Sequence, residues 1–153
     1  MTSDTRDNQQ EGKEIFSFVA FSNTPFYQAI NHSLVDLSRL SPGQRVVDLA
    51  CGTGGVTKII LDKLRGARES FVIGVDMSAI ALKQAREELE TRKLAMVEFV
   101  QGQAEQLSQL VKESVDAVVF CNAIHLVTDK AKLVGEVFNT LGSGGVFAFN
   151  TSF

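Results

Sequence analysis

The sequence predicts an α/β fold, a doubly wound and Rossmann-like three-layer sandwich with a parallel sheet of about five strands. From Arg45 onward, short apolar runs alternate with longer segments whose apolar residues recur at helical spacing. The short runs are nearly continuous, which is typical of strands buried on both faces of a parallel sheet. Right-handed crossovers between such strands place helices on both faces of the sheet.

The length and composition are those of one globular domain. The chain has 153 residues, of which 44% are hydrophobic and 22% are charged, enough for a core but too few for two ordinary domains. No apolar run approaches the roughly 20 residues that span a bilayer. The polar first residues carry neither the basic nor the apolar region of a secretory signal. We therefore expect a cytoplasmic protein with no membrane partner.

Charge and cysteine content exclude further classes. The net charge is −3, which lacks the basic footprint of a nucleic-acid-binding protein. The two cysteines, Cys51 and Cys121, are seventy residues apart and have no CxxC or CxH companion. We therefore expect no nucleic-acid partner, no disulfide framework and no metal site.

The chain begins with a segment that has no periodic apolar residues. Residues 1–14 are expected to form a flexible arm, because they cannot offset the entropy of ordering. Residues 15–153 are expected to form the domain. Thr24 followed by Pro25 is a helix start signal, and apolar residues then recur at helical spacing as far as the Ser-Pro-Gly sequence at 41–43. This pattern predicts a helix before the first strand.

Each later strand and helix rests on its own apolar pattern. The runs that predict strands are 46–50, 71–75, 96–100, 117–121 and 146–149. Between them, four sets of apolar residues each trace one face of a helix. These sets are Val56, Ile59, Ile60 and Leu64; Leu82, Ala85 and Leu89; Ala104, Leu107 and Val111; and Leu133, Val134, Val137, Phe138 and Leu141.

The first strand runs into a glycine-rich loop before the next helix. Gly52 and Gly54 allow a sharp turn and let a ligand approach the main chain at the carboxyl end of the strand. A tight turn with no ligand is the alternative. Thr57 stands where a dinucleotide fingerprint has its third glycine, and Lys58 is misplaced for a P-loop. A phosphate cradle is therefore disfavoured.

Two acidic residues accompany this loop. Asp48, within the first strand, is expected to point into the loop, where it would repel a pyrophosphate and attract an ammonium or sulfonium group. Asp76 follows Gly54 by twenty-two residues, near the spacing at which an acid accepts the hydroxyls of an adenosine ribose. The alternative for Asp76 is the N-cap of the next helix, for which Ser78 is at least as good a candidate.

Four segments of the chain read DLACGTGG, IGVDMS, VQGQAEQL and VDAVVFCNAIHLV across residues 45–127. In this order and spacing they resemble the motifs of class I S-adenosylmethionine-dependent methyltransferases. The closest likeness is to the small-molecule type of ubiquinone biosynthesis and polyketide tailoring. The resemblance implies S-adenosyl-L-methionine as cofactor, a small-molecule acceptor, and the strand order 3-2-1-4-5.

The resemblance also implies roles for the motif residues. Asp48 would lie near the methionine ammonium, mostly through water, while Asp76 would hold the ribose diol and Met77 would cover one face of the adenine. Gln103, where the family often has an acid, would accept from the adenine amine; its alternative is an exposed position near the N-cap of the third crossover helix. The expected cofactor-binding residues are Asp48, Ala50, Cys51, Gly52, Thr53, Gly54, Asp76, Met77, Gln103, Ala104, Cys121 and Asn122.

Methyl transfer is an in-line displacement on an activated sulfonium, so the protein mainly aligns the reactants and excludes water. His125, after the fourth strand, is the candidate catalytic residue, because histidine titrates near neutrality and can act as a general base. The alternative for His125 is a packing residue. Asn122 is expected to bond backbone near the cofactor. Ala123 and Ile124 replace both prolines of the signature of nucleobase methyltransferases, which disfavours that substrate class.

Aromatic residues crowd the segment before the first strand, where the family often places a lid over cofactor and acceptor. The alternative is that they cover the sheet as part of the core. These residues are Phe16, Phe18, Phe21, Phe26 and Tyr27.

The last apolar run predicts the fifth strand. The family fold has seven strands in the order 3-2-1-4-5-7-6, so the resemblance implies that the usual C-terminal hairpin is lacking. An uncovered, phenylalanine-rich edge strand is an association hazard, and we expect a homodimer or partner contact through residues 146–153. Two hypotheses for function follow: an active small-molecule methyltransferase, or a non-catalytic S-adenosylmethionine-binding or scaffold module without the acceptor half.

Overall fold

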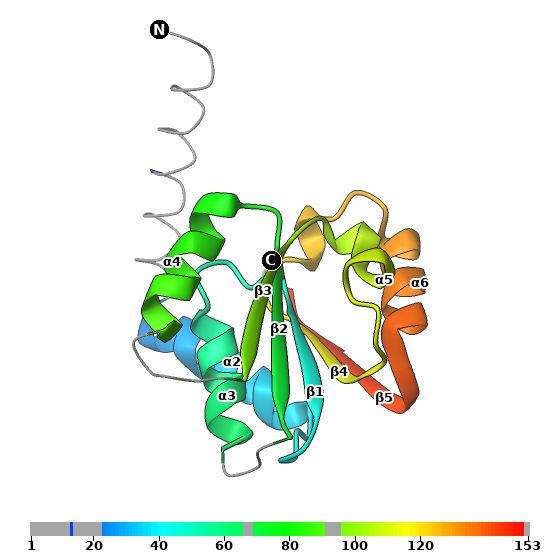
Figure 1. Cartoon of the computed structure of the whole chain (residues 1–153). Coiled ribbons are helices and arrows are strands. Elements are labelled where there is room, and N and C mark those ends of the chain that lie inside the picture. Colours follow the sequence, from blue (N-terminus) through cyan, green and yellow to red (C-terminus); the bar gives the residue numbers. More distant parts are fainter. Residues whose placement is uncertain (1–12, 14–22, 66–68, 91–95, 152–153) are drawn as a thin grey trace, which may run out of the picture.

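Every neighbouring pair of strands in the sheet is parallel, as expected for a sheet that helices cover on both faces. The computed structural model describes residues 13, 23–65, 69–90 and 96–151 (Figure 1). The order β3-β2-β1-β4-β5 confirms the predicted fold class and strand order. The strands are β1 (Arg45–Leu49), β2 (Phe71–Asp76), β3 (Val97–Gln101), β4 (Val115–Phe120) and β5 (Leu141–Phe149).

Three helices cover one face of the sheet (Figure 1): α2 (Pro25–Leu37), α3 (Gly55–Lys63) and α4 (Ala79–Glu90). α2 starts as predicted, with Pro25 in its first turn directly after Thr24. The core between these helices and the sheet contains fully buried aliphatic residues from both layers, including Ile60 of α3, Val46 of β1 and Val72 of β2.

The other face is covered by α5 (Leu107–Leu110) and α6 (Lys130–Thr140), together with two 3-10 turns, η1 (Ala104–Gln106) and η2 (Ile124–Leu126). Leu107 and Leu133 bury their side chains in a second core, which also contains Val47 of β1. The sheet is therefore packed on both sides, and the predicted three-layer sandwich is confirmed.

The crossover between β3 and β4 is helical over a shorter stretch than predicted. The apolar pattern extends the third crossover helix to Val111, but α5 ends at Leu110 and Val111 is extended, with φ −112° and ψ 106°. Gln106 is the last residue of η1 and the N-cap of α5, and its φ of −125° interrupts the helical backbone between them. Val111 is buried all the same, so its periodic apolar position reflects burial and not helix.

β5 begins five residues earlier than predicted. Leu141 becomes extended immediately after α6 and pairs with Val115. The register with β4 shifts between Val115 and Ala117, and Gly144 in the glycine-rich stretch has φ +77°. Glycines at an irregularity of this kind hide a strand from pattern analysis, because they leave no apolar run to detect.

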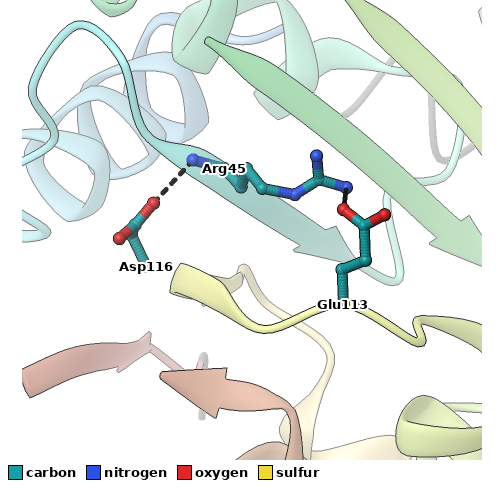
Figure 2. A network of polar contacts seen from close by, with 3 residues as sticks. All are labelled: Arg45, Glu113 and Asp116. Carbon is teal, nitrogen blue, oxygen red and sulfur yellow. Dashed lines mark hydrogen bonds and ion pairs between the residues drawn. The ribbon is translucent and has the colours of Figure 1, made fainter. Parts of the chain in front are cut away.

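A polar network joins the amino ends of the central strands (Figure 2). The backbone N–H of Arg45 donates to Asp116 at 2.8 Å, and its guanidinium pairs with Glu113 at 2.8 Å. The same guanidinium lies 5.2 Å from the ring centroid of Phe71. These contacts link β1, β2 and β4 at the end of the sheet where the strands begin.

The direction of winding reverses at β1. The chain moves outward from β1 through β2 to β3, and then returns to place β4 and β5 on the other side of β1. In open α/β sheets, ligands bind at the carboxyl ends of the strands beside such a switch point. The fold therefore predicts a ligand site at the carboxyl ends of β1 and β4.

Some expectations concern residues outside the described part of the chain. The arm predicted for residues 1–14, except residue 13, and the aromatic residues Phe16, Phe18 and Phe21 lie there. Tyr27 is buried in the core, whereas Phe26 is 70% exposed. Among the described residues, no helix has the length and apolar character needed to span a membrane.

Two glycine-to-alanine substitutions are predicted to have opposite effects. A Cβ at Gly74 of β2 would lie 2.5 Å from the ring of Phe99 and 3.0 Å from the sulfur of Cys51, whereas Gly135 lies on the exposed side of α6 and has open space. We expect Gly74→Ala to lower the free energy of unfolding by about 1–3 kcal/mol. Gly135→Ala should raise it by about 0.5–1 kcal/mol. Chemical denaturation measures both, and equal effects would contradict the packing described here.

Candidate functional site

The loop after β1 is a tight turn held by its own backbone. Ala50, Gly52 and Gly54 all have left-handed backbones, with φ of 56°, 54° and 87°. Gly54 also approaches α4 closely, since a Cβ there would lie 3.3 Å from the Cβ of Ala85. The N–H of Gly54 donates to the carbonyl of Cys51 at 2.9 Å. Only glycine meets both the conformational and the steric demand at Gly54.

Asp48 lies beneath this loop. Its side chain is almost fully buried, and one carboxylate oxygen accepts a 2.6 Å hydrogen bond from the hydroxyl of Thr57 in α3. The other oxygen is buried with no hydrogen-bond partner among the described residues. Burial raises the pKa of Asp48 to about 7, against the lowering effect of the Thr57 hydrogen bond, and the charge of Asp76 raises it further.

Asp76 joins the end of β2 to the glycine loop. One carboxylate oxygen accepts from the N–H of Gly52 at 2.8 Å, and the other accepts from the N–H of Ser78 at 2.9 Å. The hydroxyl of Ser78 in turn accepts from the N–H of Ala81 at 3.2 Å, so Ser78 is the residue that caps α4. The carboxylate of Asp76 is therefore held at the loop and is not the N-cap.

A cleft of about 390 Å³ opens at the carboxyl ends of the strands. Among the residues that line it, the charged side chains are those of Asp76 and Glu105, both acidic. Apolar residues from the ends of β1, β2 and β4 supply much of the remaining wall. The lining consists of Leu49, Ala50, Val75, Asp76, Met77, Gly102, Gln103, Ala104, Glu105, Phe120, Ala123, Leu126, Val127 and Thr128.

Three asparagines hold the turn after β4. Asn122 has a left-handed backbone, with φ 52°, a conformation that asparagine adopts more readily than most residues with a side chain. Its amide donates to the side-chain oxygen of Asn31 in α2 at 3.1 Å, and its backbone N–H donates to the side-chain oxygen of Asn150 at 2.6 Å. The thiol of Cys121 also donates to Asn31, at 3.2 Å. The turn is therefore fixed from α2 and from the end of β5.

The structure brings five of the expected cofactor-binding residues together in the cleft. These are Ala50, Asp76, Met77, Gln103 and Ala104.

The other expected residues surround the cleft or lie apart from it. Gly52 does not line the cleft, but its backbone N–H donates to Asp76, which does. Thr53 and Gly54 line a separate cleft of about 520 Å³ beside α2, α3 and α4. His125 is exposed on η2 and does not line the cleft, so its catalytic role stays a prediction.

The two thiols are held in their neutral form. Burial raises the pKa of Cys51 well above its ordinary value and that of Cys121 to about 12, and the nearby Asp48 charge raises both further. No group of three metal-ligating side chains occurs in the part of the chain that the structure describes.

Sequence reasoning missed the residues that act at long range. Asn31 and Asn150 lie 91 and 28 residues from Asn122, and neither stands in a recognisable motif. Thr57 was noted only as a missing glycine, whereas its hydroxyl is the partner of Asp48. Asn31 could have been found from the sequence, because it is a polar residue on the otherwise apolar side of a helix and needs a buried hydrogen-bond partner.

Comparisons with known proteins agree with this geometry. Residues 40–153 match the family model described as a methyltransferase domain. The ubiquinone/menaquinone biosynthesis C-methyltransferase UbiE of Stenotrophomonas maltophilia is 31% identical over 149 residues, covering 92% of this chain and 58% of that protein. Trans-aconitate 2-methyltransferase of Paracidovorax citrulli is 33% identical over 117 residues, covering 76% of this chain and 42% of that protein.

A solved structure shows the same fold. The SAM-dependent methyltransferase from Aquifex aeolicus superposes with a TM-score of 0.74 at 17% identity, covering 87% of this chain and 70% of that one. The chain spans little more than half the length of its UbiE relative. The match over residues 40–153 places the chain in the family of methyltransferase domains, in agreement with its four motifs.

Proposed function

We propose that the chain binds S-adenosylmethionine in the cleft and transfers its methyl group to a small-molecule acceptor. The observation that carries this proposal is the carboxylate of Asp76, held by the N–H of Gly52 at the switch point of a methyltransferase-family sheet. A carboxylate at the end of the second strand suits a ribose diol.

The residues present fit this cofactor. It carries a sulfonium and an ammonium group, and the charged side chains of the cleft lining are acidic. When bound, the cofactor supplies an activated methyl group. The protein then has to orient the reactants and exclude water, for which the apolar wall at Phe120, Ala123 and Val127 is suited.

The expected roles are proposed at the positions that the structure supports. Met77 is 69% exposed at the cleft and is available to cover an adenine face. Gln103 is exposed at the N-cap position of η1, as its alternative describes, but it lines the cleft and its side chain makes no capping hydrogen bond, so its amide is available to an adenine amine. Asp48 would act from beneath the loop, through its charge and without direct contact, because it is buried and does not line the cleft.

A second candidate function is cofactor binding without methyl transfer. Among the described residues of the cleft lining there is no histidine, cysteine, lysine or tyrosine, so Asp76 and Glu105 are the titratable groups there. His125 would have to reorient to act as a base. An acceptor that loses no proton during transfer needs no such base.

We also propose that β5 mediates self-association, with no nucleic-acid partner. Among the described strands, β5 pairs with β4 alone, and Phe149 near its end is 50% exposed. An apolar groove of about 360 Å³ lies beside it, lined by Phe26, Ile30 and Leu37 of α2. Edge strands with apolar surface favour pairing with a second chain.

Self-association predicts a dimer in sedimentation velocity experiments. Phe149→Glu should shift the chain to a monomer, because a carboxylate would be buried in the contact. Phe138→Glu is the matched control, since Phe138 is 79% exposed on α6 and lies outside the groove. A monomeric parent chain, or equal effects of the two variants, would contradict this contact.

Substitution of Asp76 predicts a loss of cofactor affinity. Asp76→Asn weakens the charge-assisted hydrogen bonds to a ribose diol, and we expect affinity for S-adenosylhomocysteine to fall about 10–100-fold in calorimetry. Asp116→Asn makes the same chemical change at the opposite edge of the sheet, where Asp116 bonds Arg45 (Figure 2). It should leave the affinity unchanged. An Asp76→Asn variant that binds like the parent would contradict the proposed site.

The buried carboxylate predicts a pH dependence of stability. Asp48 ionises at an ordinary pKa of 3.8 when unfolded and near 7 when folded, so between these values the folded chain holds a proton that the unfolded chain releases. The free energy of unfolding should therefore fall as pH rises through this window, by up to about 4 kcal/mol from Asp48. Asp48→Asn should flatten the profile in denaturation series. An unchanged slope in this variant would show that another group is responsible.

A further inference from the structure

The wall of the cleft formed by the end of β4 and the segment after it carries no charge. We call it the acceptor wall; it consists of Phe120, Ala123, Leu126, Val127 and Thr128. Leu126 stands out because it is 74% exposed while lining the cleft, and its backbone N–H is fixed by the carbonyl of Ala123 at 2.9 Å. An exposed leucine held at the rim of a cleft provides apolar surface for a ligand.

The charged side chains of the cleft lining are acidic. Asp76 and Glu105 are the charged residues among the described lining, and Asp48 lies beneath the loop. An anionic ligand entering the cleft would meet like charge and would lose its hydration without gaining a cationic partner.

Lys130, which follows the acceptor wall in sequence, already has a hydrogen-bond partner. Lys130 donates from its ammonium group to the carbonyl of Val127 at 2.8 Å, and it does not line the cleft. Lys58 faces the separate cleft beside α3, and Arg86 donates to the carbonyl of Phe99. Among the described residues, none of these cations is placed to pair with a carboxylate or phosphate in the cleft.

We infer that the acceptor is an uncharged, apolar molecule that enters over Leu126, and that the cleft discriminates against acceptors bearing a carboxylate or phosphate. This inference rests on the proposed function, since it takes the same cleft as the place of transfer. It makes Leu126 a specificity-determining residue. It also separates this chain from relatives named for acidic acceptors, such as trans-aconitate 2-methyltransferase.

A matched pair of probes tests this inference. 2-Naphthol and 6-hydroxy-2-naphthoate share a ring system and a hydroxyl group and differ by one carboxylate. Binding of each to the full chain saturated with S-adenosylhomocysteine is measured by calorimetry at about pH 8, where ordinary histidines are neutral. We expect 2-naphthol to bind at least about tenfold more tightly.

Substitutions of Leu126 test whether this residue sets the preference for the uncharged probe. Leu126→Lys places a cation at the entrance and should narrow or reverse the preference. Phe138→Lys, at a similarly exposed position on α6, should leave it unchanged. Circular dichroism of both variants checks that the fold is retained, and Leu126→Ser provides a second variant that should weaken 2-naphthol binding without adding charge.

The outcomes separate this inference from the proposed function. Equal or tighter binding of the carboxylate, no binding of either probe at millimolar concentration, or an unchanged preference in Leu126→Lys would overturn the inference while cofactor binding stands. Absence of saturable S-adenosylhomocysteine binding would contradict the proposed function. In that case the same probe ratio is measured on the chain alone, where the cleft residues and their charges are unchanged, and it decides the selectivity in the same way.

Discussion

The hydrogen bond from the Thr57 hydroxyl to the Asp48 carboxylate joins α3 to β1 beneath the glycine loop, at 2.6 Å. Both side chains are almost fully buried, so this bond fixes the start of α3 against the end of β1. The loop above it then bonds to Asp76 through Gly52, which ties the end of β1 to that of β2. The wall of the cleft that the ends of β1 and β2 form depends on this arrangement.

The sheet could be predicted from the sequence because its strands are encoded locally. Each is a short apolar run, and each helix between them has an apolar face. The strand order followed from the motif resemblance, and the bounds of β5 and of the third crossover helix differ most from the prediction. Asp76 was predicted at the site because its spacing from the glycine loop is fixed by one βα unit. The burial of Asp48 was not predicted. Its hydrogen-bond partner Thr57 was considered only as the residue that replaces the third glycine of a dinucleotide motif. The bonds of Asn122 to Asn31 and Asn150 join distant segments, which local patterns do not record.

The acidic character of the site links stability to function. Burying Asp48 disfavours its ionised form, and Asp76 nearby increases that cost. A fold selected for stability alone would place a neutral residue there. The retained carboxylates are consistent with a cationic ligand that relieves their mutual repulsion, and titratable groups perturbed in this way are concentrated at functional sites. The acidic residues of the cleft lining are suited to a cationic ligand, and the uncharged acceptor wall is suited to apolar contact.

The central claim is that an adenosine-bearing cofactor binds where β1, β2 and β3 end. Titration of the nitrogen-15-labelled full chain with S-adenosylhomocysteine, followed by amide chemical shifts, tests it most directly. The account predicts saturable shifts for the amides of Gly52, Gly102 and Gln103, with those of Arg45 and Asp116 at the opposite edge unchanged. No saturable shift, or the largest shifts at the Arg45 and Asp116 edge, would contradict it.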